Sequence, residues 1–174
     1  WMAIASSSDG AKLAAGVWEG HIWTSCDSGL SWTERSVGGA PKLWLDIASS
    51  SDGTKLAAVA CCRAQNDGGN PWTSTDSGES WTERFLQPPS PRNWRGIASS
   101  SDGTELAAVV SAGNIWTSTD SGGTWTERTV IAGGRDWTAI ASSSDGTMLA
   151  AVIYGESIWT STDSGVSWRE TSTG

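Results

Sequence analysis

The chain has 174 residues, which is long enough for one globular domain with its own core. Its 19 Asp and Glu outnumber its 11 Lys and Arg, and the net charge of -8 repels phosphate backbones, so nucleic acid is not expected as a partner. No segment approaches the roughly 20 apolar residues of a membrane span, so membrane insertion is not expected.

A seven-residue string, Ile-Ala-Ser-Ser-Ser-Asp-Gly, occurs four times and begins at Ile4, Ile47, Ile97 and Ile140. Successive copies are offset by 43, 50 and 43 residues, a period typical of propeller blades. A Trp precedes each Ile by three residues, and recurring positions of the repeat account for 12 of the 13 Trp, all except Trp18. We therefore divide one domain, 1–174, into four blades at about 1–43, 44–93, 94–136 and 137–174.

Each repeat predicts four short strands, which in the third repeat span 94–100, 106–110, 114–119 and 124–129. Ser-Ser-Asp-Gly-Thr forms the first turn and Asp-Ser-Gly the third, because Asp caps its own turn backbone and Gly accepts a positive φ. No segment has helical periodicity. Evenly spaced short strands in this period predict an all-β fold, a β-propeller of four four-stranded antiparallel blades.

The second strand reads Leu-Ala-Ala-Val in three repeats, at 56–59, 106–109 and 149–152. An apolar run without alternation indicates a strand buried on both faces, as in blades stacked face to face. The first strand, rich in Ala and Ser, is expected to lie innermost, where converging sheets leave little room. A parallel β-helix is the rival architecture, but its coils are shorter and lack regular hairpin turns. The blades close a ring of four or form half of a larger ring.

The motif Trp-Thr-Ser-x-Asp-Ser-Gly-x-x-Trp occurs in every repeat, starting at Trp23, Trp72, Trp116 and Trp159. Its Ser-x-Asp-x-Gly-x-x-Trp part resembles the Asp box, or bacterial neuraminidase repeat, of sialidases, sortilin-type receptors, xyloglucan-degrading enzymes and photosystem II assembly factors. The resemblance covers the whole chain and implies a propeller in which the box is a structural turn between the third and fourth strands. It also implies an extracellular or periplasmic location. The matching structural residues are Asp27, Gly29, Trp32, Asp76, Gly78, Trp81, Asp120, Gly122, Trp125, Asp163, Gly165 and Trp168.

Variation in length is confined to the second loop and to the connections between blades, which share one face of a propeller. The second blade carries a six-residue insertion there, containing Cys61, Cys62 and Arg63, and variable loops on a rigid scaffold are where ligands bind. Aligning the second loops places Trp18, Cys61, Ser111 and Tyr154 at one position. The candidate ligand-binding residues on this face are Trp18, Glu19, His21, Arg63, Arg92, Arg135, Tyr154 and Glu156.

Aromatic rings flanked by polar groups suit a glycan or an extended peptide. Alternatively, Trp18 and Tyr154 cover the ends of the cores between blades. Tyr154 is the sole Tyr and His21 the sole His, so a sialidase-like Tyr nucleophile, a His-rich metal site and a Ser-His-Asp relay all lack further support. Most acidic residues recur at the same place in every repeat, which favours scaffolding over the paired carboxylates of glycoside hydrolysis. We therefore predict no catalytic residue, metal ion or cofactor.

Because families that share the Asp box have unrelated activities, the function must be argued from the loops. We expect a non-catalytic binding or assembly module whose partner is a glycan or a protein. A second possibility is a structural protein that self-associates, as a homo-oligomer, into a larger ring or filament. A third is a fragment of an Asp-box glycoside hydrolase.

Overall fold

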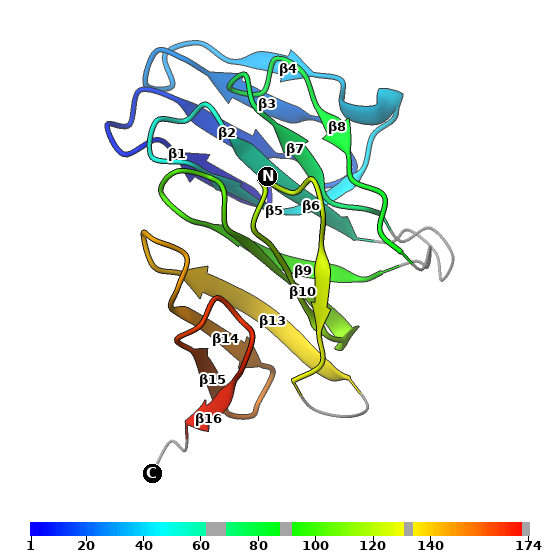
Figure 1. Ribbon diagram of the computed structural model, residues 1–174. Coiled ribbons are helices and arrows are strands. Elements are labelled where there is room, and N and C mark those ends of the chain that lie inside the picture. The colour runs from blue at the N-terminus through cyan, green and yellow to red at the C-terminus, as the bar shows by residue number, and fades with distance from the viewer. Residues whose placement is uncertain (62–68, 88–91, 131–133, 172–174) are drawn as a thin grey trace.

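The computed structural model describes residues 1–61, 69–87, 92–130 and 134–171, and sixteen β-strands lie within these ranges (Figure 1). The described residues contain no α-helix and a single 3-10 turn, Val37–Gly39. None of their helical segments could cross a membrane. The all-β prediction is confirmed for this part of the chain, whereas Cys62 and Arg63 lie outside it.

The first two repeats each form a separate four-stranded antiparallel sheet. Unit 1 contains β1 (Ala3–Ser6), β2 (Leu13–Gly16), β3 (Ile22–Ser25) and β4 (Thr33–Arg35). Unit 2 contains β5 (Leu43–Ser49), β6 (Leu56–Cys61), β7 (Trp72–Ser74) and β8 (Thr82–Glu83).

The third and fourth repeats differ from the prediction, because hydrogen bonds join them into one eight-stranded sheet. Where the two repeats join, β10 pairs with β13, and Ser111 lies opposite Asp136 and Gly113 opposite Arg135. It forms because β10 runs on beyond its β9 partner and β13 starts two residues before its Trp, so that their ends overlap. Unit 3 contains β9 (Trp94–Ser99), β10 (Leu106–Gly113), β11 (Ile115–Ser118) and β12 (Thr126–Arg128). Unit 4 contains β13 (Arg135–Ser142), β14 (Leu149–Ile153), β15 (Ile158–Ser161) and β16 (Arg169–Thr171).

The four units fan out in an open arc (Figure 1). Their first strands lie next to one another in the order β1, β5, β9 and β13, as expected for innermost strands. Among the described residues no strand pairing connects unit 1 with unit 4. The arc is therefore not the closed ring of four that the sequence left open as one alternative.

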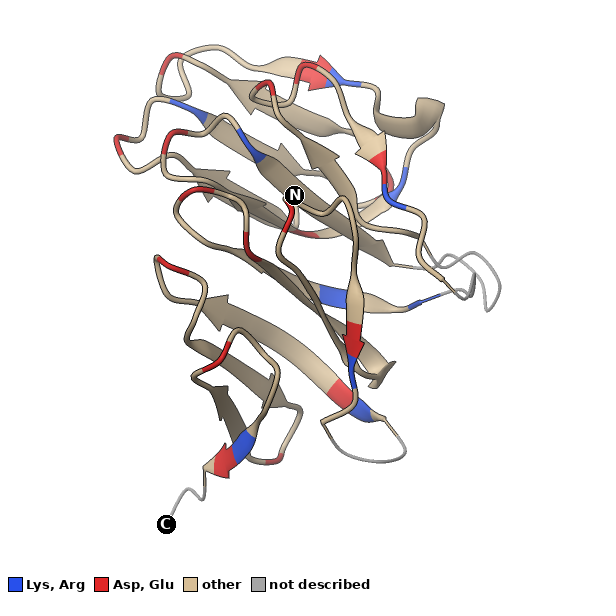
Figure 2. Cartoon of the chain, viewed as in Figure 1, with Lys and Arg blue, Asp and Glu red and all other residues tan. Residues whose placement is uncertain are grey.

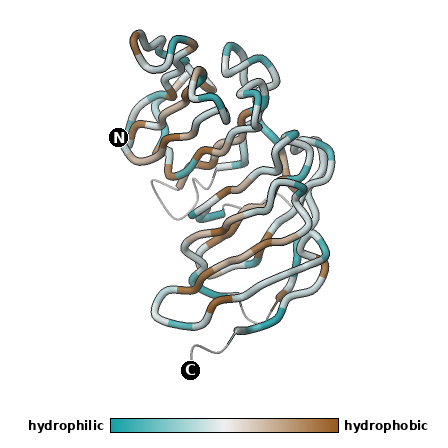
Figure 3. The backbone as a smooth tube through the Cα atoms, turned by 90° about the vertical axis from the view of Figure 1, so that its left-hand side faces the viewer, coloured by the Kyte–Doolittle hydropathy of each residue, from teal (hydrophilic) through white to brown (hydrophobic). Residues whose placement is uncertain are grey.

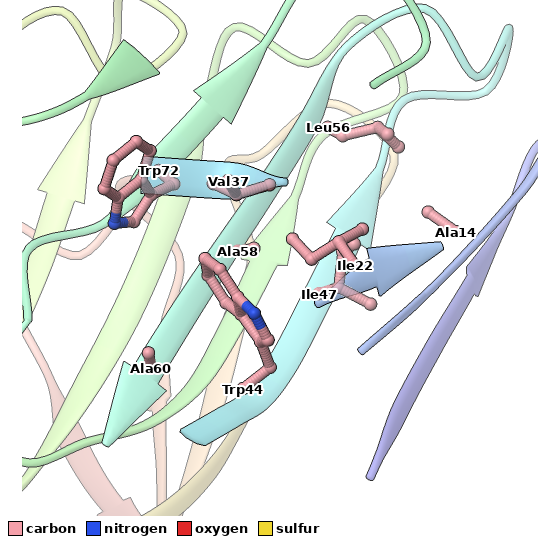
Figure 4. Packing of buried hydrophobic residues seen from close by; sticks show 9 residues of the cluster. All are labelled: Ala14, Ile22, Val37, Trp44, Ile47, Leu56, Ala58, Ala60 and Trp72. Carbon is pink, nitrogen blue, oxygen red and sulfur yellow. The ribbon is translucent and has the colours of Figure 1, made fainter. Parts of the chain in front are cut away.

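Three cores fill the spaces between neighbouring units, and each contains the Trp that opens the second unit of the pair. Figure 4 shows the core between units 1 and 2, where Trp44 and Ile47 lie beside Ala14 and Ile22. Burying one Trp removes about 200 Å² from water and contributes roughly 5 kcal/mol of transfer free energy. Hydrophobic residues accordingly follow the strands, and hydrophilic ones gather at the turns (Figure 3).

The first and third turns of each unit lie on one face, as the sequence predicts. In unit 1 the main-chain N–H of Ser28 donates to the carbonyl of Ala11, 2.9 Å away, and the other three units repeat this bond. Acidic residues lie at the tips of these turns, on the left in Figure 2. On the opposite face Gly20 of the second loop pairs with Lys42 of the following connection.

The third turn holds its Asp in a fixed network. Ser25 Oγ and the N–H of Ser31 donate to Asp27 Oδ1 over 2.8 and 2.9 Å, and Trp32 Nε1 donates to the carbonyl of Gly29 over 3.1 Å. Hydrogen bonds from the Ser31 hydroxyl, then the Ser31 N–H, lower the pKa of Asp27 to about 2. The equivalent Asp in the other units accepts the same bonds.

Candidate functional site

A hollow of about 520 Å³ lies where the first strands begin, on the face of the second loops. Met2, Leu45, Arg95 and Thr138 line it, and each directly follows the Trp that opens its unit. The repeat therefore brings one side chain per unit to the inner edge of the arc. The remaining residues that line this hollow are Ser111, Asp136 and Tyr154.

A second hollow of about 230 Å³ shares Asp136 and Tyr154 with the first. It lies between units 3 and 4, and Arg135 and Glu156 add one charge of each sign to its wall. We call the two hollows together the axial groove. Its lining combines apolar side chains, both charges and one aromatic ring, a mixture that suits a ligand with both apolar and polar groups.

Asp136 organises the junction of the two hollows. Its Oδ1 atom accepts hydrogen bonds from Ser111 Oγ at 3.1 Å and from the N–H of Ala112 at 3.2 Å. Its carbonyl accepts the N–H of Tyr154 at 3.1 Å. The Tyr154 ring is 82% exposed, so it does not cover a core and is available for contact with a ligand.

The second loops of three units share one turn conformation, which explains why their sequences align. The residues after Trp18, Ser111 and Tyr154 all have a positive φ: Glu19 at 54°, Ala112 at 55° and Gly155 at 69°. Equivalent residues thus occupy equivalent places on the arc. Of these aligned residues, Ser111 and Tyr154 line the axial groove and Trp18 does not, so the second loops of units 3 and 4 contribute to the groove and that of unit 1 does not.

Of the residues predicted from the sequence, Arg135, Tyr154 and Glu156 come together in the axial groove. Trp18 and Glu19 lie in the second loop of unit 1 and line neither hollow. Trp18 is 45% exposed, so about half of its ring surface faces solvent rather than a core.

Two further predicted residues are packed against the protein. The guanidinium of Arg92 lies over the Trp116 ring, 4.3 Å from its centroid, and burial lowers the Arg92 pKa. Lys42 occupies the same place in unit 2, 5.2 Å from the Trp72 ring centroid. The Nδ1 atom of His21 is buried without a hydrogen-bond partner among the described residues. Neither Arg92 nor His21 lines the axial groove.

Sequence reasoning missed two charged residues. Arg95 of β9 lines the groove, and Asp46 follows the groove residue Leu45 in the neighbouring strand, β5. The signal was present, because the four units begin Trp-Met-Ala-Ile, Trp-Leu-Asp-Ile, Trp-Arg-Gly-Ile and Trp-Thr-Ala-Ile. A charge that interrupts an otherwise neutral repeated segment marks a position with its own role. Burial raises the pKa of Asp46, and its hydrogen bonds from the N–H groups of Ile97 and Ile47 act in the opposite direction.

No group of three or more His, Cys, Asp or Glu within the described ranges could hold a metal ion. The carboxylates that face the axial groove are Asp136 and Glu156, and the Oδ1 atom of Asp136 accepts hydrogen bonds from the second loop of unit 3. The arrangement can therefore contact a ligand through one ring, two guanidinium groups and two carboxylates.

No protein-family model matches the chain, and no curated protein matches it in sequence. Solved structures do resemble it. A GH74 enzyme of Niastella koreensis aligns over 96% of this chain with a TM-score of 0.67 and 21% identity. YCF48 from Cyanidioschyzon merolae aligns over 99% with a TM-score of 0.71 and 15% identity. A structure of YCF48 bound to D1 peptide aligns over 99% with a TM-score of 0.71 and 17% identity.

The chain spans 23% of the length of this GH74 enzyme and 56% and 54% of the two YCF48 chains. Likeness at such identities shows the fold and leaves the activity to be argued from the site. Together with the antiparallel sheets, it establishes a β-propeller fold, and the open arc corresponds to part of each larger propeller chain.

Proposed function

We propose that the chain supplies four four-stranded blades of a propeller and acts as a non-catalytic binding module that holds an extended segment of a protein in the axial groove. The observation that carries the proposal is the convergence of Met2, Leu45 and Arg95 with the exposed ring of Tyr154 around one hollow. Each comes from a different unit, so a ligand bound there contacts the whole arc.

The lining of the groove favours a peptide over a neutral sugar. Met2 and Leu45 offer apolar surface, whereas Arg95 and Asp136 offer opposite charges within the same hollow. An extended peptide presents apolar side chains, charged side chains and backbone amides along one line, and so can use all of these groups. The structure of YCF48 bound to D1 peptide supports the same class of partner for a similar fold.

The test begins with a random peptide library displayed on phage and selected against the immobilised chain. A selected peptide is then labelled and its Kd measured by fluorescence polarisation. We expect Tyr154→Ala to weaken binding tenfold or more, because a buried aromatic contact at an interface is worth about 2 kcal/mol. Trp18→Ala is the matched control, since its ring occupies the equivalent loop position outside the groove. Failure to enrich any peptide, or a Kd unchanged by Tyr154→Ala, contradicts the proposal.

A glycoside hydrolase remains the second candidate because Asp136 and Glu156 line the same small hollow. Glycoside hydrolysis requires two carboxyl groups placed across the scissile bond. Turnover of an arylglycoside that is abolished by Glu156→Gln would replace the binding module with an enzyme. A reproducible hit on a glycan array, lost in Tyr154→Ala without turnover, would replace the peptide with a carbohydrate.

A further inference from the structure

The first strands of units 2, 3 and 4 each carry one extra residue directly after the Trp that opens the unit. The pairing of β5 with β6 passes from Trp44 to Asp46 and leaves out Leu45. The pairing of β9 with β10 leaves out Arg95, and that of β13 with β14 leaves out Thr138. Such an extra residue is a β-bulge, a local irregularity that redirects a side chain. All three bulged residues line the larger hollow of the axial groove.

The bulge allows one strand to face both the core and the groove. Side chains alternate along a regular strand, so residues three apart point to opposite faces. Trp44 and Ile47 are three apart and yet lie in one core, as do Trp94 and Ile97. The extra residue corrects the alternation between them, and its own side chain lies at the groove. The groove residues are therefore placed by the backbone of the repeat.

The bulged position differs in chemistry from unit to unit. The Trp before it and the Ile after it are the same in every unit, whereas the bulged residue is Leu45, Arg95 or Thr138. Variable residues on a constant scaffold are where binding specificity resides. The Arg95 side chain is exposed, and among the described residues it has no hydrogen bond or ion pair. An unpaired guanidinium beside an apolar side chain suits a ligand with an anionic group next to an apolar one.

Asp46 connects the bulges of units 2 and 3. It directly follows Leu45 in β5, and its carboxylate accepts hydrogen bonds from the main-chain N–H of Ile47 in the same strand and of Ile97 in β9. Ile97 lies two residues after Arg95. The carboxylate therefore holds the backbone beside one bulge at a fixed distance from the backbone beside the other.

This side-chain link stands where a main-chain link is lacking. Among the described residues no strand pairing joins the sheets of units 2 and 3, whereas β10 pairs with β13 between units 3 and 4. The N–H of Ser51 in unit 2 donates to Ser101 in unit 3, but these residues belong to the first turns on the opposite face. Near the groove, the separation of Leu45 and Arg95 thus depends on Asp46 and on the apolar core.

We propose that Asp46 is a positioning residue of the axial groove, which sets the separation of Leu45 and Arg95 so that these two side chains act as one specificity-determining pair. The pair selects a peptide segment with an apolar side chain next to an acidic one. The inference rests on the proposed function, because it concerns the same groove and the same class of ligand. An Asp46 that only stabilised the fold would change the free energy of unfolding and leave the selectivity of the groove unchanged.

A charge exchange tests the pair. Peptides selected from a phage library against the immobilised chain are expected to share an acidic residue next to an apolar one. Arg95→Glu should weaken the binding of a selected peptide by at least about tenfold in fluorescence polarisation, because it replaces an attraction with a repulsion. A peptide with Lys in place of that acidic residue should bind Arg95→Glu more tightly than it binds the wild type. Selected peptides without a common acidic residue, or an Arg95→Glu variant with the wild-type preference, contradict the proposal.

A double-mutant cycle tests the positioning role. Asp46→Ala should weaken a selected peptide by about tenfold in the wild-type and Tyr154→Ala backgrounds, but by no more than about twofold in the Arg95→Ala background, where the side chain that it positions is absent. Asp46→Asn keeps one acceptor oxygen and should recover part of the affinity. Asp76→Ala is the matched control, since it also removes a carboxylate that accepts hydrogen bonds in unit 2, but on the opposite face, and it should leave the Kd unchanged.

Unfolding curves confirm that each variant is folded under the conditions of the binding assay, and Asp46→Asn carries the cycle if Asp46→Ala unfolds. Equal losses from Asp46→Ala in the Arg95→Ala and Tyr154→Ala backgrounds, or an equal loss from Asp76→Ala, overturn the positioning role. Peptides whose binding depends on Tyr154 but on neither Asp46 nor Arg95 overturn this inference and leave the proposed function standing. A chain that enriches no peptide overturns both.

Discussion

Asp46 Oδ2 accepts a hydrogen bond from the main-chain N–H of Ile97, 2.8 Å away, and so ties the first strand of unit 2 to the first strand of unit 3. Its Oδ1 atom accepts the N–H of Ile47 over 2.9 Å. In unit 1 the residue at this position is Ala3, and in unit 3 it is Gly96, so neither of the other two described unit boundaries has such a carboxylate. The link between units 2 and 3 is therefore held by a side chain as well as by the apolar core.

Asp46→Ala is expected to lower the free energy of unfolding by roughly 1–3 kcal/mol, because it leaves two N–H groups near the axis without their acceptor. Asp46→Asn keeps one side-chain carbonyl oxygen and should lose less. Urea denaturation followed by Trp fluorescence measures the change. Glu79→Ala, an exposed acid in a turn, serves as the control and should match the wild type. A stable Asp46→Ala would mean that water replaces the carboxylate.

The sequence allowed the strands and cores to be predicted because both depend on features that recur in every unit. Trp44, Trp94 and Trp137 each open a unit and each lie buried between two units, so periodicity alone placed them. The Asp–Gly turns were predictable for the same reason, since each network is closed within a few residues of one turn.

What could not be predicted depends on contacts between units or on the ends of the arc. Trp1 matches Trp94 in sequence but not in exposure, because burial is decided by a neighbour that the local pattern does not contain. The joint between Ser111 and Asp136 arises from an overlap of two strand ends. Arg92 was assigned to the ligand face from its position, but whether a cation meets a ligand or an indole ring is decided by tertiary packing.

Trp94→Ala tests how much of the stability resides in the cores between units. Trp94 is fully buried and its Nε1 donates to the carbonyl of Gly69 over 2.7 Å, so we expect a loss of roughly 3–5 kcal/mol. Trp18→Ala removes the same side chain outside the cores and should cost less than about 1 kcal/mol. Chemical denaturation of both variants checks the difference. Equal losses would show that Trp18 packs as tightly as Trp94.

The second-loop turns allow a matched pair of substitutions with opposite expected signs. Ala112 adopts a φ of 55°, a conformation that is strained for an L-residue and easy for glycine, so Ala112→Gly should raise the free energy of unfolding by roughly 0.5–1 kcal/mol. Gly155 has a φ of 69° and open space around its Cβ position, so Gly155→Ala should lower stability by about 1 kcal/mol through backbone strain alone. Thermal unfolding measures both. A change of the same sign in the two variants would show that their turns relax to a negative φ.

Stability should fall in acid because of the turn carboxylates. Hydrogen bonds from the hydroxyls of Ser31, Ser50, Ser143 and Ser167, followed by main-chain N–H groups, lower the pKa of their partners to about 2 from the ordinary 3.8. Those partners are Asp27, Asp52, Asp145 and Asp163.

As the pH falls from 3.8 towards about 2, the unfolded chain binds protons at these four positions before the folded chain does, so the stability that the turns contribute above pH 3.8 is progressively lost. Asp46 acts in the opposite direction, because its raised pKa lets the folded chain bind a proton first. Glu105 acts in the same direction as Asp46, because burial raises its pKa as well. The eight aspartates whose pKa is lowered outweigh these two groups, so the midpoint of thermal unfolding should be level near neutral pH and drop in this acid range. Asp163→Asn should make the drop shallower and Asp46→Asn steeper, and a midpoint that rises on acidification would contradict the assignment.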